Sequence, residues 1–144
     1  MTNAALARRL QRHLQHRGNA IQRNAVLVIS PFEEDHILVD RVSDGSTWGV
    51  LGAWDCREAL ELLHANPTAV VLCDCELPDG NWKDILAALT LLAHPPLLVV
   101  TSRLADERLW GDVLHLGVYD VLAKPLVERE VLWVIDSAWR HWVR

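Results

Sequence analysis

Short apolar segments alternate with amphipathic segments along most of this chain. One uncharged segment, residues 68–73, runs directly into Asp74 and is followed by turn residues at 77–80. A continuous apolar run of this length is typical of a parallel strand that is covered on both faces. Open parallel sheets bind ligands at the carboxyl ends of their strands, so we expect the carboxylate of Asp74 to lie in a ligand-binding crevice.

The same alternation predicts five strands, each followed by a helix. The expected strands are residues 25–29, 47–53, 68–73, 97–100 and 119–123. The first expected helix begins after Ser30 and runs to about 42. The others span about 56–64, 82–93, 105–116 and 127–142, with Asp55 as candidate N-cap of the second. This order predicts an α/β fold: a doubly wound, five-stranded parallel sheet with helices on both faces.

The start of the first helix has a recognisable capping pattern. Ser30 is the expected N-cap, Pro31 the first helical residue and Glu33 the partner of a capping box. Glu34 and Asp35 would then lie in the first turn with Glu33, where acidic side chains interact favourably with the helix dipole.

Composition narrows the class of protein. With 144 residues, 51% of them hydrophobic, the chain can form one domain with a substantial core, and disorder is not expected. We find no apolar run long enough to cross a bilayer and no secretory signal pattern, so we expect a cytoplasmic protein. Cys56, Cys73 and Cys75 are an odd number without metal-like spacing, which indicates reduced thiols in the core.

The net charge of −5 is unevenly distributed. Residues 1–23 contain five arginines and no acid, and every one of the 19 Asp and Glu residues lies beyond them. We therefore divide the chain into a basic N-terminal extension, residues 1–24, and a domain, residues 25–144. The acidic character of the domain argues against nucleic acid as its partner.

The extension has leucines at a four-residue step, Leu6, Leu10 and Leu14, which predicts an amphipathic helix. Three roles stay open for it. It docks on the acidic domain or a sister chain, it is a solvated leader, or it contacts nucleic acid or an anionic membrane.

Three polar side chains stand at the ends of successive predicted strands: Asp74, Thr101 and Lys124. In a parallel sheet these ends meet at one edge. A carboxylate there can attack phosphorus, while the hydroxyl hydrogen-bonds a phosphoryl oxygen and the ammonium neutralises charge. The combination predicts a phosphoryl site. The alternative is a structural ion pair between Asp74 and Lys124 without turnover.

These segments resemble a known family. VLCDCELPDG around Asp74, VVTS with Thr101 and GVYDVLAKP with Lys124 are similar to the receiver domain of bacterial response regulators, over about residues 25–142. The resemblance implies a flavodoxin-like sheet of strand order 2-1-3-4-5. It also implies that Asp74 accepts a phosphoryl group from a histidine kinase or phosphotransfer protein, and that no other enzymatic activity is involved.

The sequence departs from the family at the acidic pair that holds Mg²⁺, where it has Ser30 and Pro31. Neither is a usable Mg²⁺ ligand, so we expect no metal ligand here and at most weak Mg²⁺ binding. The alternative is that Glu33, Glu34 or Asp35 turns back to the metal position. Without a metal ion, phosphorylation should slow by roughly a hundredfold to ten-thousandfold unless another group substitutes.

Three more side chains are expected at the mouth of the pocket: Glu76, Ser102 and Arg103. An ion pair between Glu76 and Arg103 would close the mouth, or Arg103 would neutralise a bound phosphate. The alternative is that both charged side chains are solvated and contribute little.

Most of the seven tryptophans are expected in the core. Trp133 is the exception, because it lies opposite the apolar face of the last predicted helix, and Trp110 lies at the margin of the helix before it. With Tyr119 they form a predicted protein interface, unless the extension covers Trp133. The aromatic residue that the family keeps in the fifth strand falls at Val121, with Tyr119 close by.

Two functions remain. The first is a stand-alone receiver domain that signals through protein contacts, as a monomer or homodimer, when Asp74 is phosphorylated. The second is a pseudo-receiver that acts as an adaptor without phosphorylation. A flavodoxin-like enzyme or cofactor-binding protein is disfavoured, because the sequence has neither a glycine-rich phosphate loop nor a nucleophile–base pair.

Overall fold

The structure, a computed structural model, describes residues 24–104 and 106–143, so the predicted extension lies outside it except for Asn24. Five parallel strands form one sheet in the order β2-β1-β3-β6-β7. They are β1 (Ala25–Ile29), β2 (Gly49–Ala53), β3 (Thr68–Asp74), β6 (Leu97–Ser102) and β7 (Asp120–Ala123). The predicted doubly wound sheet and its strand order are confirmed.

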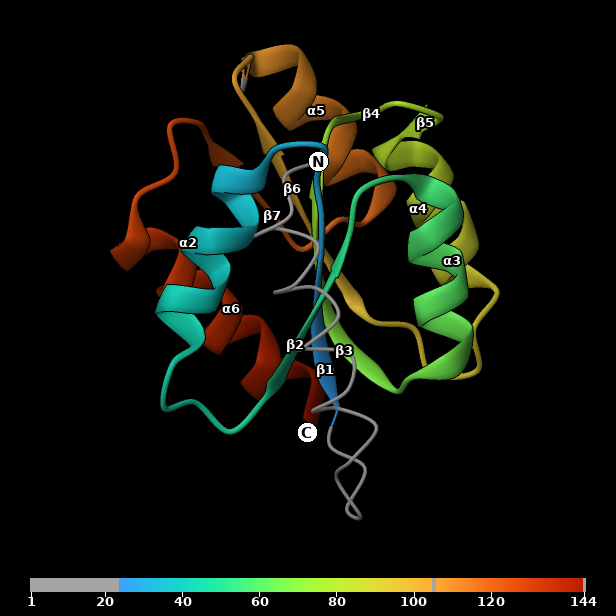
Figure 1. Ribbon diagram of the computed structural model, residues 1–144. Coiled ribbons are helices and arrows are strands. Elements are labelled where there is room, and N and C mark those ends of the chain that lie inside the picture. Colours follow the sequence, from blue (N-terminus) through green and yellow to red (C-terminus); the bar gives the residue numbers. More distant parts are fainter. Residues whose placement is uncertain (1–23, 105, 144) are drawn as a thin grey trace.

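Within residues 24–104 and 106–143, five helices cover the two faces of this sheet (Figure 1). They are α2 (Glu33–Ser43), α3 (Cys56–Ala65), α4 (Trp82–Thr90), α5 (Glu107–Leu116) and α6 (Glu128–Val143). Helices α2 and α6 pack on one face, and α3, α4 and α5 on the other. In the described part of the chain, none of the helices has the length and apolar character needed to cross a membrane.

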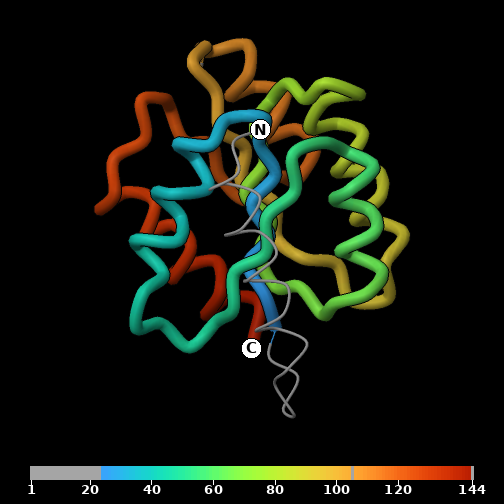
Figure 2. The backbone as a smooth tube through the Cα atoms, in the orientation of Figure 1, coloured from blue at the N-terminus to red at the C-terminus, as the bar shows by residue number. Residues whose placement is uncertain are grey.

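Strand β3 is the centre of the core because it pairs with β1 on one side and β6 on the other. All seven of its residues are buried, and they alternate between the faces. Val70 and Leu72 contact the α2–α6 layer, whereas Val71 and Cys73 contact the α3–α5 layer. Its last residue, Asp74, therefore lies in the middle of the carboxyl edge, where the loops after β1, β3 and β6 gather (Figure 2).

Several predicted element boundaries differ slightly from the structure, and two of them have a clear local reason. Helix α4 ends at Thr90 and not at 93, because Leu91 and Leu92 donate to carbonyls three residues back and so tighten the last turn. Strand β2 begins at Gly49 and not at 47, since Gly49 is already opposite Ala25, where β1 begins. The predicted turn at 77–80 forms a small hairpin of β4 (Glu76–Leu77) and β5 (Gly80–Asn81).

The tryptophans are less buried than predicted. Only Trp48 and Trp82 are fully buried, whereas Trp54, Trp139 and Trp142 are half-buried. The indole N–H of Trp142 donates to the carbonyl of Pro95 at 3.0 Å, in a hydrogen bond that lies at the surface. An amphipathic ring of this kind packs with its body and uses its polar atom at the boundary.

The start of α3 is held by two carboxylates. Asp55 is the N-cap, as predicted, and accepts from the backbone N–H of Glu58 at 2.8 Å. Asp79, in the β4–β5 hairpin, accepts from the N–H groups of Cys56 at 2.7 Å and Arg57 at 3.1 Å. Partial burial would raise the pKa of Asp79, but these hydrogen bonds outweigh it and lower the pKa below its ordinary 3.8. The hairpin next to Asp74 is thereby attached to α3.

Replacing Asp79 with alanine is expected to destabilise the fold by about 1 kcal/mol at neutral pH, because two N–H groups of α3 lose their acceptor. The folded-state pKa of Asp79 is lowered, so its contribution is present above pH 3.8 and is lost as the pH falls through the folded-state value. Urea unfolding of both proteins from neutral pH to pH 3.8 and below measures this. A difference that persists unchanged at acidic pH would contradict the assignment.

Candidate functional site

The structure brings the three strand-end side chains together. Asp74 is the register partner of Thr101 in the β3–β6 pair. Lys124 follows β7, and its N–H donates to the carbonyl of Ser102 at 2.9 Å, which continues the β6–β7 pairing. The ammonium of Lys124 donates to Oδ2 of Asp74, and both side chains are almost completely buried. The predicted convergence at one edge of the sheet is therefore present.

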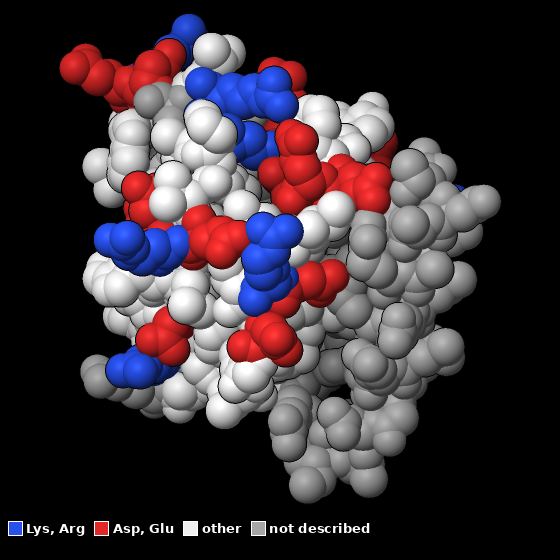
Figure 3. Space-filling view, turned by 60° about the vertical axis from the view of Figure 1, so that its left-hand side comes forward, with Lys and Arg blue, Asp and Glu red and all other residues white. Residues whose placement is uncertain are grey.

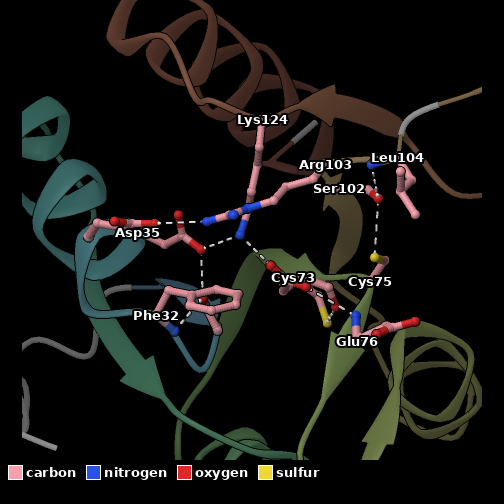
Figure 4. A network of polar contacts seen from close by, with 12 residues as sticks. Phe32, Asp35, Cys73, Cys75, Glu76, Ser102, Arg103, Leu104 and Lys124 are labelled. Atoms are coloured by element: carbon pink, nitrogen blue, oxygen red, sulfur yellow. Dashed lines mark hydrogen bonds and ion pairs between the residues drawn. The ribbon is translucent and has the colours of Figure 1, made fainter.

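A fourth residue, Asp35 of α2, completes this group. Lys124 Nζ donates to Oδ2 of Asp35 at 2.6 Å, and the hydroxyl of Ser30 donates to the same oxygen at 2.6 Å. The side chains of Asp35 and Lys124 are 7% and 5% exposed. The ammonium thus contacts two buried carboxylates. Figure 4 shows the side chains of Asp35 and Lys124 pointing toward one another.

The predicted capping of α2 by Ser30 is wrong, and this explains the place of Asp35. The helix begins at Glu33 after an extended Phe32, which makes no side-chain cap. The Ser30 hydroxyl instead accepts from the N–H of Phe32 at 3.0 Å and donates to Asp35. Side chains in a helix tilt toward its N-terminus, so the carboxylate of Asp35 points back to the end of β1.

Of the three acidic residues at this helix start, Asp35 is the one that turns into the pocket. The sequence offered this only as the alternative to a first-turn dipole role, because the spacing was counted from Ser30. The sequence signal for this role of Asp35 is a hydroxyl residue at the end of a strand, Ser30, followed five residues later by a carboxylate. Glu34 stays exposed and pairs elsewhere.

The charge state of Lys124 follows from these contacts. Burial by itself would lower the pKa of this ammonium. The hydrogen bonds and charges of Asp35 and Asp74 outweigh burial and raise the pKa above its ordinary 10.5. Lys124 is therefore protonated at neutral pH, and the group of two carboxylates and one ammonium carries one net negative charge.

An aromatic ring and two exposed charges form one side of the pocket mouth. Phe32 lies with its ring 4.7 Å from Lys124 Nζ and 5.4 Å from the Arg103 guanidinium carbon. Arg103 pairs with Glu34 at 3.4 Å, and not with Glu76 as the sequence suggested. The reason is that stacking on Phe32 directs the guanidinium toward α2 and away from the β4–β5 hairpin.

The other predicted mouth residues lie on the opposite side. The N–H of Glu76 donates to Oδ1 of Asp74 at 3.1 Å, which fixes the carboxylate, while the side chain of Glu76 is exposed. Ser102 is buried, and its hydroxyl accepts from the N–H of Leu104 at 3.0 Å and from the thiol of Cys75 at 3.2 Å. Ser102 thus holds the loop after β6 close to the end of β3.

The cysteines are free thiols, but their positions differ. Cys56 and Cys73 are buried in the core, and burial raises the pKa of Cys56 to about 12. Cys75 was also predicted in the core, but it is only half-buried and lines the pocket next to Asp74.

Open space lies on both sides of this group. A cleft of about 1030 Å³ is lined by Asp74, Glu76 and Phe32, among others. A second hollow of about 530 Å³ is lined by Asp35, Lys124 and Leu126. Arg103 lines both. An anion of the size of a phosphoryl group therefore has room to approach Asp74 from the cleft.

The predicted interface residues are exposed to solvent to different extents. Trp133 on α6 is 70% exposed and Trp110 on α5 is 39% exposed. Tyr119 is half-buried and packs on α6, with its hydroxyl 2.8 Å from that of Ser137. Val121 is buried in the core, so β7 presents no aromatic ring at that position.

Two curated proteins are similar in sequence. The chain is 33% identical over 110 residues to a protein-glutamate methylesterase/protein-glutamine glutaminase of Burkholderia thailandensis, covering 72% of this chain and 30% of that protein. It is 32% identical over 114 residues to the transcriptional regulatory protein QseB of Escherichia coli O157:H7, covering 76% and 51%. The chain thus spans about a third to a half of the length of these relatives. No protein-family model matches it.

Solved structures share the fold closely. The receiver domain of a putative Luxo repressor protein from Vibrio parahaemolyticus has a TM-score of 0.78 and 16% identity, over 84% of this chain and 93% of that one. A CheY-like response regulator receiver domain from Methanospirillum hungatei has a TM-score of 0.74 and 17% identity, over 85% and 98%. This chain therefore has the fold of response regulator receiver domains, and about three quarters of it is similar in sequence to parts of these two curated proteins.

Proposed function

We propose that this receiver domain takes up a phosphoryl group on Asp74 from the phosphohistidine of a histidine kinase or phosphotransfer protein. A carboxylate oxygen of Asp74 attacks phosphorus, the P–N bond of the donor breaks, and the imidazole nitrogen keeps the electron pair. The product is an acyl phosphate on Asp74. The phosphorylated domain then signals through contacts with another protein in the cytoplasm, without further enzymatic activity.

The observation that carries this proposal is the buried contact between Asp74 and Lys124 at the edge of an open cleft. The N–H of Glu76 fixes one oxygen of Asp74, and Lys124 contacts the other. Thr101 adjoins Asp74 on the next strand, where its hydroxyl can reach a phosphoryl oxygen. In this proposal they serve as nucleophile, cation and hydrogen-bond donor toward one phosphoryl group.

Incubation with acetyl phosphate tests the proposal directly. We expect intact-mass spectrometry to detect one phosphoryl adduct, and we expect its loss in Asp74→Asn, which keeps the shape of the side chain but lacks the nucleophilic oxygen. Asp112→Asn is the matched control, because Asp112 lines the same cleft but is exposed on α5. A folded protein that forms no adduct under any condition would overturn phosphorylation.

A second candidate function, an adaptor that needs no phosphorylation, is favoured by the exposed ring of Trp133. It projects from α6 opposite the buried residues Val131, Ile135 and Ala138, and exposed aromatic residues are frequent interface anchors. The face formed by α2 and α6 has interspersed acids and bases, including the pair of Arg41 and Glu128 at 2.6 Å, so charge alone defines no partner there (Figure 3).

The interface role of Trp133 can be measured without a known partner. If this surface mediates self-association, Trp133→Ala is expected to lower the weight-average molar mass that analytical ultracentrifugation measures at high protein concentration. Leu114→Ala, also exposed but on α5, is expected to have a smaller effect. Equal mass for the wild type and both variants would exclude self-association through this ring.

A further inference from the structure

The two carboxylates at the centre of this pocket are already engaged by protein donors, and with these donors in place they do not fit a divalent cation. In the described part of the chain, no group of three or more His, Cys, Asp or Glu side chains is arranged to hold a metal ion. Asp35 accepts from Ser30 and from Lys124, while Asp74 accepts from Lys124 and from the N–H of Glu76. Mg²⁺ needs a nearly octahedral shell of oxygen ligands at short distances.

The place between the two carboxylates is moreover taken by a positive charge. Lys124 Nζ is 2.6 Å from Asp35 and contacts Asp74 directly, and its side chain is 5% exposed. A cation that bound both carboxylates would lie beside this ammonium among side chains that are only 5–7% exposed, where repulsion between like charges is strong. Phe32 covers the ammonium with its ring and limits its movement toward solvent.

We propose that the ammonium of Lys124, held by Asp35, occupies the cation position of this pocket, so that Asp74 takes up a phosphoryl group without a divalent cation. This inference rests on the proposed function. An ammonium has three N–H donors. When the phosphoryl group is in place, one donor stays on Asp35 and another moves from Asp74 to a phosphoryl oxygen. Asp35 is therefore a positioning residue for Lys124.

The first experiment compares adduct formation from acetyl phosphate in excess EDTA and in millimolar MgCl₂. We expect rates that agree within about threefold, whereas a pocket that depends on the metal would lose roughly a hundredfold or more in EDTA. An adduct that forms only with Mg²⁺ would overturn this inference and leave the proposed function intact. No adduct in either condition would instead overturn the proposed function, and with it the need for any cation.

The second experiment measures cation binding without any phosphoryl transfer. Isothermal calorimetry with MnCl₂ is expected to show no binding to the wild type, and binding to Lys124→Met, in which both carboxylates become available. Asp35→Asn combined with Lys124→Met should lose that binding again. Millimolar binding by the wild type, or no gain in a folded Lys124→Met, would contradict the inference. If Lys124→Met does not fold, the MnCl₂ titration of the wild type alone still tests the inference.

The positioning role of Asp35 has its own readout. We expect Asp35→Asn to slow adduct formation and to move the alkaline limit of the rate profile to lower pH, because the Lys124 ammonium loses one of its two anionic partners. Asp136→Asn is the matched control, since Asp136 is a partly exposed aspartate on α6 that pairs with Arg140 and lines neither hollow. An unchanged alkaline limit in Asp35→Asn would show that Asp35 does not position the ammonium.

Discussion

Lys124→Met is expected to lower the free energy of unfolding by about 3–5 kcal/mol, the range seen when one partner of a buried ion pair is removed. The methionine leaves Asp35 and Asp74 buried next to each other, with two negative charges and no compensating cation. Neither carboxylate can turn to water without leaving the pocket, because both side chains are 7% exposed. The lost stability is therefore mainly an electrostatic effect.

Guanidinium chloride unfolding of both proteins, followed by tryptophan fluorescence, measures this difference. The folded-state pKa of Lys124 is raised above 10.5, so the stabilisation is fully present below pH 10.5 and is lost as the pH rises through the folded-state value. The wild type should lose stability in that alkaline range, whereas Lys124→Met should lose less. Adding Asp35→Asn to the variant should restore part of the stability by removing one buried charge.

Arg103→Met is the control for this prediction. Its ion pair with Glu34 is about two-thirds exposed on both sides, and an exposed pair contributes under about 1 kcal/mol. If both variants unfolded at the same denaturant concentration, the buried group around Lys124 would not be a source of stability.

Trp82→Ala is expected to lower the free energy of unfolding by about 3–5 kcal/mol, as large-to-small core substitutions of this size do. Trp82 is the first residue of α4 and is 4% exposed. It packs in the cluster between the sheet and α3–α5 and also lines the cleft at Asp74. The substitution would leave a cavity directly below the β4–β5 hairpin, so we also expect slower adduct formation on Asp74.

Two variants make this prediction specific to burial. Trp82→Phe should be less destabilising than Trp82→Ala, because most of the ring volume remains. Trp133→Ala, which removes the same side chain from an exposed position, should change stability by less than about 0.5 kcal/mol. Similar losses in Trp82→Ala and Trp133→Ala, measured by urea unfolding, would contradict the assignment of Trp82 to the core.

The elements with strong local patterns were predictable from the sequence. The uncharged run before Asp74 is β3, and Asp55 caps α3, because both depend on residues adjacent in the chain. The proximity of Asp74, Thr101 and Lys124 was also predictable, since a doubly wound topology brings the carboxyl ends of its strands to one edge.

The ion pairs at the pocket were not predictable in the same way. The sequence suggested that Glu76 pairs with Arg103, and only the fold places Phe32 under the guanidinium and Glu34 beside it. Partners of exposed charges are chosen by small energy differences among neighbours that come from several loops. Nothing in the spacing of these residues distinguishes one partner from another.

By itself the sequence determined the order of strands and helices, the buried centre of the sheet and the edge at which the polar residues meet. Only the tertiary structure decided where α2 begins and that Asp35 enters the pocket. A capping motif at Ser30 offers about 1 kcal/mol and is local. It gives way to a buried contact between Asp35 and Lys124, 89 positions apart in the chain, because that ion pair forms only when the sheet has brought both residues together.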